Sequence, residues 1–267
     1  MQYPSYNALV QGDPSVMIDI VILPDGYSEK EMSKFRSDCD KFVSDLFAFS
    51  PFKENREKFN IRGVIAPSEE SGTDIPGSRI WKRTILNTGY YTFDSERYLM
   101  TYDNKSVREL ASNTPYDQVY IMVNSTKYGG GAIYNYFSTS VNSNSSSAKI
   151  LVHEFGHGFA GLGDEYDDGS TSFNDMYSTG VEPWEPNLTT LTHFNHKWEK
   201  MLPSGTPVPT PIDPENQKRL GVYEGGGYVA KGVYRPLPDC LMRSFSGSEF
   251  CPVCTRAILR MIEFQTK

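Results

Sequence analysis

The strongest local pattern in this sequence is the run Ile150-Leu151-Val152-His153-Glu154-Phe155-Gly156-His157-Gly158-Phe159-Ala160-Gly161-Leu162-Gly163-Asp164-Glu165-Tyr166. Three serines at 145–147 precede its apolar residues, and glycines at 161 and 163 follow them. This order predicts a helix that begins near the serines and ends at the glycines. Two histidines four residues apart lie on one face of such a helix, one turn from each other. We therefore expect His153 and His157 to bind one zinc ion.

A catalytic zinc site usually has three protein ligands and leaves a fourth position for water, so a third ligand is expected downstream. Asp164 follows Gly161 by three residues and offers a carboxylate; its neighbour Glu165 is the alternative. Glu154, next to the first histidine, is expected to take a proton from the activated water. The pattern His-Glu-x-x-His also occurs in proteins that bind no metal, where its histidines are purely structural.

The same run resembles the active-site signature of the bacterial IgA-peptidase family of zinc metallopeptidases. Other segments resemble that family in the same order: Ile20-Val21-Ile22-Leu23-Pro24-Asp25-Gly26-Tyr27, residues 67–74, Val123-Asn124-Ser125 with Tyr128-Gly129-Gly130, residues 225–228 and 232–236, Cys240-Leu241-Met242, and Cys251-Pro252-Val253-Cys254. The resemblance covers most of residues 17–265. The family's name records the substrate of one member and does not fix the substrate here.

The resemblance implies an α/β fold: a metzincin-like catalytic domain with a twisted, largely parallel sheet, an active-site helix, and a C-terminal subdomain that ends in a helix. In metzincin-type proteases the third ligand falls three residues after the turn glycine, which favours Asp164 over Glu165. Such proteases also place a methionine in a tight turn beneath the histidines. Met242 within residues 240–244 resembles that methionine, and ordinary core packing is the alternative. The resemblance further implies a bacterial protein that is secreted or held in the cell envelope, although residues 1–4 do not look like a signal peptide.

Hydrophobic periodicity predicts strands that alternate with helices, and hence a largely parallel sheet. The expected strands cover residues 17–23, 59–66 and 119–123; expected helices begin at the capping box 28–31 and cover 95–112 and 254–264. Residues 128–140 are expected to form an edge strand that holds an extended peptide, or else an ordinary hairpin arm. Residues 223–234 are predicted to form a hairpin with a glycine turn. The proline-rich stretch 203–214 is predicted to be an extended surface segment.

Composition indicates a soluble globular protein, with 38% hydrophobic and 22% charged residues. The chain is expected to be a single catalytic domain over residues 1–267, with an upper part at 1–164 and a C-terminal subdomain at 165–267. A net charge of -7 without a basic stripe argues against nucleic acid as a partner. No apolar run approaches the roughly 18 residues that a membrane span needs. Of the four cysteines, 39, 240, 251 and 254, either two form a disulfide or all are buried thiols.

We expect a zinc-dependent endopeptidase that acts on protein or peptide substrates. Glu154 would serve as the general base, and Tyr234 or Tyr228 would assist in stabilising the oxyanion. A zinc hydrolase of non-peptide amides would use the same residues. A catalytically silent binding module is the other alternative, suggested by 13% aromatic residues.

Overall fold

The computed structural model describes residues 2–167, 177–178, 180–214, 217–247 and 249–267. The chain forms two compact units, one of Met1–Phe159 with Met261–Lys267 and the other of Ala160–Arg260. The expected division of one catalytic domain at residue 164 stays a prediction. Within the described ranges, no helix has both the length and the apolar character that crossing a bilayer requires.

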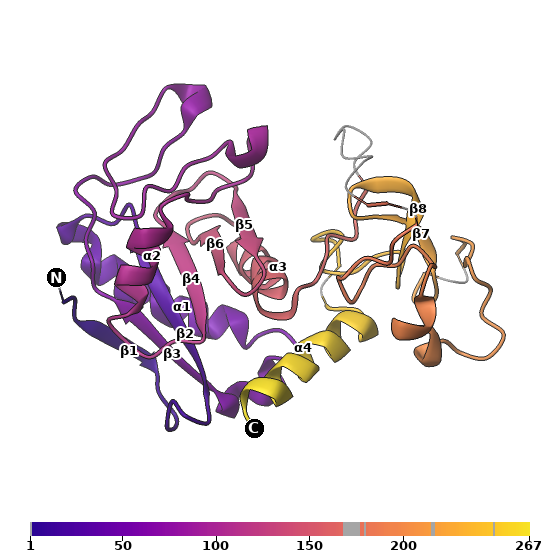
Figure 1. Cartoon of the computed structure of the whole chain (residues 1–267). Coiled ribbons are helices and arrows are strands. Elements are labelled where there is room, and N and C mark those ends of the chain that lie inside the picture. The colour runs from indigo at the N-terminus through magenta and orange to yellow at the C-terminus, as the bar shows by residue number, and fades with distance from the viewer. Residues whose placement is uncertain (1, 168–176, 179, 215–216, 248) are drawn as a thin grey trace. The chain divides into compact units, whose positions relative to one another are not determined.

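The first unit is built on a six-stranded sheet in the order β1-β3-β2-β4-β6-β5 (Figure 1). The four central strands run parallel, and the edge strands β1 and β5 are each antiparallel to their neighbour. The prediction of an α/β fold with a largely parallel sheet is confirmed, and its metzincin-like character stays a prediction. The strand bounds are β1 Ser5–Leu9, β2 Ile18–Asp25, β3 Phe59–Val64, β4 Gln118–Val123, β5 Gly130–Ile133 and β6 Phe137–Val141.

Successive side chains of a strand point to opposite faces of the sheet. Helices cover both faces and bury the apolar side chains on each. On one face, Tyr120 of β4 contacts Phe42 of helix α1 (Met32–Leu46) and Phe155 of helix α3 (Ser147–Ala160). On the other face, the neighbouring β4 residues pack in one cluster with helix α2 (Asn104–Ala111). The strands of the parallel part are buried on both faces, as this arrangement requires.

The helix expected over residues 95–112 is wrong in its first half. The structure has helix only from Asn104, and the Asp103 side chain caps it by accepting the Ser106 backbone N–H. Residues 98–100 instead run extended: Leu99 donates its N–H to Gly130 O at 3.0 Å, and Met100 bridges to Gly89. Tertiary pairing has overridden a weak helical pattern.

The second unit contains the hairpin of β7 (Tyr223–Gly226) and β8 (Val229–Arg235). Its two turn residues, Gly227 and Tyr228, both have positive φ angles, 59° and 67°, which suit the right-handed twist of a two-residue hairpin. Helix α4 (Pro252–Gln265) starts in this unit. The described residues 203–214 contain neither helix nor strand. The predicted hairpin, proline-rich segment and final helix are confirmed.

Candidate functional site

Helix α3 brings the rings of its two histidines together, edge to face. The Nε2 atoms of His153 and His157 lie 3.1 Å apart, and the ring planes are at 88°. Two nitrogens bound to one tetrahedral zinc at ~2.0–2.1 Å lie about 3.3 Å apart, so this pair fits two positions of a zinc site. His153 is buried and His157 half-buried.

The histidines are held in place because the rest of α3 is packed in the core. The rings of Phe155 and Phe159 stack with their centroids 5.1 Å apart and their planes nearly parallel. Both also contact Phe52, at 5.4 and 6.1 Å. The helix ends as predicted at Gly161, which has a φ of 63° that a residue with a side chain rarely adopts. Gly163 does not share this conformation.

Glu154 lies on α3 beside the glycine run that opens strand β5. A Cβ atom on Gly130 would come 2.8 Å from Glu154 Oε1 and 3.0 Å from its Cγ. Strand β6 also contacts the α3 backbone at Glu154, because Ser138 Oγ donates a hydrogen bond to Glu154 O at 2.9 Å. Sequence patterns did not reveal these supporting residues, although the glycine run at 129–131 is a signal for close backbone approach.

Strand β5 lies at the edge of the sheet and is also one arm of a hairpin with β6. That this edge holds an extended peptide stays a prediction. The outer side of Gly130 is already paired, because its N–H and C=O bond to Arg97 and Leu99. By the alternation of an antiparallel ladder, Ala132 is the next residue whose backbone groups point outward.

Asp164 belongs to the second unit, where it is clamped by the β7–β8 turn. The Tyr228 hydroxyl donates a hydrogen bond to Asp164 Oδ2, and the Tyr166 hydroxyl donates to Tyr228 at 3.1 Å. The backbone repeats the contact, since Gly227 N–H donates to Asp164 O at 2.7 Å. One oxygen of the Asp164 carboxylate is therefore oriented by a tyrosine pair.

Glu165 faces different partners from those of Asp164. Its side chain is fully buried, and Oε1 accepts a hydrogen bond from Asn187 Nδ2 at 2.9 Å and lies 3.2 Å from Cys254 Sγ. Burial raises the pKa of Glu165 well above its usual value. The two neighbouring carboxylates, which sequence alone left as alternatives, thus have separate environments.

Met242 and Tyr234 also lie in the second unit. Met242 is fully buried in a tight turn, in which Arg243 and Ser244 donate their N–H groups to Cys240 O at 2.8 and 3.0 Å. Tyr234 is in β8, its backbone paired with Thr189, and burial raises the pKa of its hydroxyl. The tight turn is confirmed, whereas Met242 as a floor beneath the histidines and Tyr234 as a catalytic residue stay predictions.

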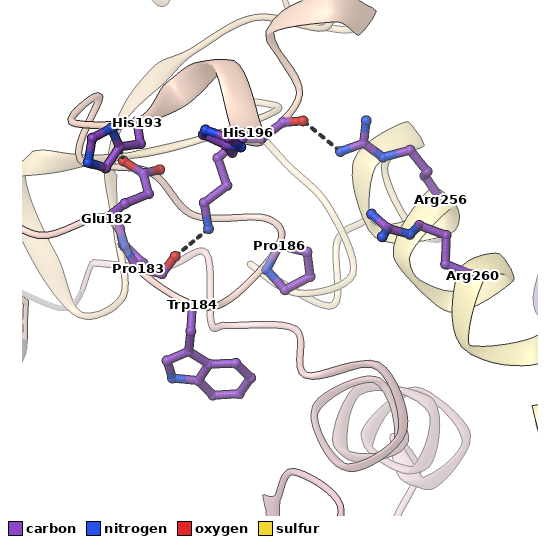
Figure 2. Close-up of a pocket in the computed structure, with 9 residues that line it drawn as sticks. Glu182, Pro183, Trp184, Pro186, His193, His196, Arg256 and Arg260 are labelled. Atoms are coloured by element: carbon purple, nitrogen blue, oxygen red, sulfur yellow. Dashed lines mark hydrogen bonds between the residues drawn. The ribbon is translucent and has the colours of Figure 1, made fainter. Parts of the chain in front are cut away.

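A separate pocket of about 490 Å³ opens in the second unit. Figure 2 shows Arg256 and Arg260 of α4 on one side and His193 and His196 on the other. Lys197 is tied down by the carbonyls of Pro183 and Glu185. Glu182 adds a negative charge, and its Oε2 accepts the His193 N–H at 3.0 Å. This mixture of charges contains no pairing of a nucleophile with a base.

Comparison with known proteins gives one family. The family described as IgA Peptidase M64 matches residues 8–219 and 212–262. No curated protein matches the chain.

Proposed function

Because the chain belongs to the IgA peptidase M64 family and is therefore a metallopeptidase, we propose that it is a zinc-dependent endopeptidase. The observation that carries this proposal is the 3.1 Å spacing of the His153 and His157 Nε2 atoms on a helix whose other residues are fixed in the core. In this proposal His153, His157 and Asp164 hold the metal.

The surroundings of the two carboxylates support Asp164 as the third ligand. Only three residues separate Asp164 from the end of α3, so chain connectivity keeps it within reach of the histidines. The tyrosine pair that orients its Oδ2 resembles the outer partners that usually fix metal-binding carboxylates. Glu165, in contrast, is occupied with Asn187 and the cysteines.

The proposed mechanism assigns the proton transfers to Glu154. A zinc ion, when bound, lowers the pKa of a coordinated water to about 7 and polarises the substrate carbonyl. Glu154 accepts the proton of the attacking water and passes it to the departing amine. Gly130 and Ser138 position this residue, the first by leaving room for its carboxylate and the second by holding its backbone carbonyl.

A peptide substrate is proposed to add to strand β5 by backbone hydrogen bonds. Support comes from the edge position of β5 and from the outward direction of the Ala132 backbone groups beyond the Gly130 bridge. Strand addition suits extended chains and needs no free terminus, which is why we propose an endopeptidase. We also propose that the protein acts in the cell envelope or outside the cell.

The proposal is tested by incubating the protein with a library of internally quenched peptides before and after treatment with 1,10-phenanthroline. Cleavage between internal residues should stop with the chelator and return when zinc is added. His153→Ala should abolish cleavage, whereas the control His196→Ala changes an exposed histidine of the second unit and should leave it intact. Cleavage that survives both metal removal and His153→Ala would refute the proposal, and turnover of non-peptide amides alone would favour the other hydrolase.

A further inference from the structure

Four potential metal ligands meet in the interior of the second unit, and none of the four has a role in the proposed mechanism. They are Glu165, Cys240, Cys251 and Cys254, called the cysteine cluster below. All four are buried, with exposed fractions between 0% and 2%, and one ligand atom of each lies within 4.8 Å of the others. All three cysteines are free thiols.

The distances in the cysteine cluster match a tetrahedral metal site. Cys240 Sγ lies 4.0 Å from Cys254 Sγ, and Glu165 Oε1 lies 3.2 Å from Cys254 Sγ and 4.0 Å from Cys251 Sγ. Two sulfurs bound to one tetrahedral zinc at ~2.3 Å lie about 3.8 Å apart, and a sulfur and a carboxylate oxygen lie about 3.6 Å apart. The observed distances lie both above and below these ideal values, so small side-chain rotations would bring all four ligand atoms to bonding distance from one zinc ion.

Backbone structure brings the four residues together. Cys251 directly precedes α4 and Cys254 is in its first turn, so both sulfurs lie at the same helix end. Cys240 begins the tight turn, whose residue Met242 accepts the Glu165 N–H at 2.8 Å. The cluster is therefore fixed by a helix start, a turn and a backbone hydrogen bond.

Backbone N–H groups point toward two of the three sulfurs. The N–H of Cys251 donates to Cys240 Sγ at 3.3 Å, and the N–H of Cys254 donates to Cys251 Sγ at 3.4 Å. A helix N-terminus also stabilises negative charge. The buried guanidinium of Arg235 interacts with the charge of Glu165, which offsets part of the excess negative charge of three thiolates and a carboxylate.

The buried carboxylate of Glu165 is only partly hydrogen-bonded within the described part of the chain. Asn187 fixes Oε1, but among the residues that the structure describes no hydrogen-bond donor reaches the buried Oε2. A buried carboxylate with one oxygen unpartnered is costly, and a cation bound at Oε1 lowers that cost because the negative charge is shared by both oxygens. A disulfide would not do so, because it joins only two of the three sulfurs and leaves the third beside the carboxylate.

We propose that the cysteine cluster binds a structural zinc ion, distinct from the metal held by the histidines. Four protein ligands close the coordination shell and leave no position for water, which is the arrangement of a structural site. Binding releases the thiol protons to solvent and involves no change of oxidation state. Glu165 is then a ligand of this ion, and this inference does not depend on the proposed peptidase mechanism.

The test uses the full chain with both histidines replaced, His153→Ala/His157→Ala, supplied with zinc and freed of loosely bound metal. We expect about one zinc ion per chain, and X-ray absorption at the zinc edge should show sulfur neighbours at ~2.3 Å. Adding Cys251→Ser should remove this zinc. Adding Cys39→Ser, the control, should not, because Cys39 is buried in α1 of the first unit.

The histidine variant alone decides the outcome if the Cys251→Ser protein does not fold. A zinc-free histidine variant, or zinc without sulfur neighbours, would overturn the inference, as would a disulfide within the cysteine cluster. If instead the wild type holds no more zinc in total than the histidine variant, and that zinc is bound by sulfur, the cysteine cluster is supported and the proposed histidine site fails. The two proposals are therefore separable in one set of samples.

Discussion

Gly130 has no side chain where the carboxylate of Glu154 lies. A Cβ atom at Gly130 would come 2.8 Å from Glu154 Oε1, closer than such atoms approach one another in folded proteins. The φ angle of Gly130 is not in the left-handed region, so the need for glycine at this position is one of space rather than of backbone conformation. Strand β5 therefore leaves, at Gly130, the space that the carboxylate of the proposed general base occupies.

Gly130→Ala should displace the Glu154 carboxylate and lower kcat by roughly 10- to 100-fold, because a small misplacement of a catalytic group is enough to cost that much. Zinc content should change little, and the unfolding midpoint should fall slightly because the added Cβ also comes 3.0 Å from Thr139 O. Steady-state kinetics and elemental analysis check this. The control is Gly180→Ala, where Ser178 Oγ, at 3.8 Å, is the only atom of the described residues within 4 Å of the added Cβ. An unchanged kcat in Gly130→Ala would argue against Glu154 as the base.

Tyr228→Phe removes the hydroxyl that donates to Asp164 Oδ2. If Asp164 is a ligand, the catalytic metal should bind about 10- to 100-fold more weakly, the usual effect of losing an outer partner. Competition with a zinc chelator measures the affinity. Tyr234→Phe is the comparison: a fall in kcat with unchanged metal affinity would support its predicted role at the oxyanion. Equal metal affinity in Tyr228→Phe and the wild type would contradict the assignment of Asp164.

Asp25 should be a main determinant of stability in the first unit. Its buried carboxylate, at the end of β2, accepts hydrogen bonds from the Thr84 hydroxyl, from the backbone N–H of Leu86, and from both the N–H and the hydroxyl of Thr88. Asp25→Ala leaves these donors unsatisfied and should lower the free energy of unfolding by at least about 3 kcal/mol. Urea denaturation measures the free energy of unfolding. The control is Asp13→Ala, which changes an exposed residue and should lower that free energy far less. Similar decreases in both variants would show that the hydrogen bonds of Asp25 contribute little to stability.

Local spacing was sufficient to predict the features that lie within one element. The interval of four residues places His153 opposite His157, and the glycine at 161 ends the helix in the left-handed conformation. The buried strands at 17–23, 59–66 and 119–123 were confirmed for the same reason, because runs of β-branched and aromatic residues have few other stable arrangements. Strand β1 was missed: Ser5–Leu9 is partly exposed and is defined by its pairing with β3 rather than by its own pattern.

Features that depend on distant partners could not be predicted. Asp164 and Glu165 are adjacent in sequence, and only Tyr228 and the cysteines give them separate environments. Likewise, the sequence did not reveal that Cys251 and Cys254 meet Cys240 and Glu165. A turn and a backbone hydrogen bond bring these residues together, and no local spacing indicates either.

The most direct test of the proposed peptidase mechanism is to measure zinc content and peptide-cleavage rate together in Glu154→Gln and the wild type. The change keeps the size of the side chain and removes its ability to accept a proton. The proposed role of Glu154 predicts the same zinc content and a cleavage rate at least about 100-fold lower, since general acid–base catalysis contributes that much or more. Cleavage at the wild-type rate with zinc retained would contradict it.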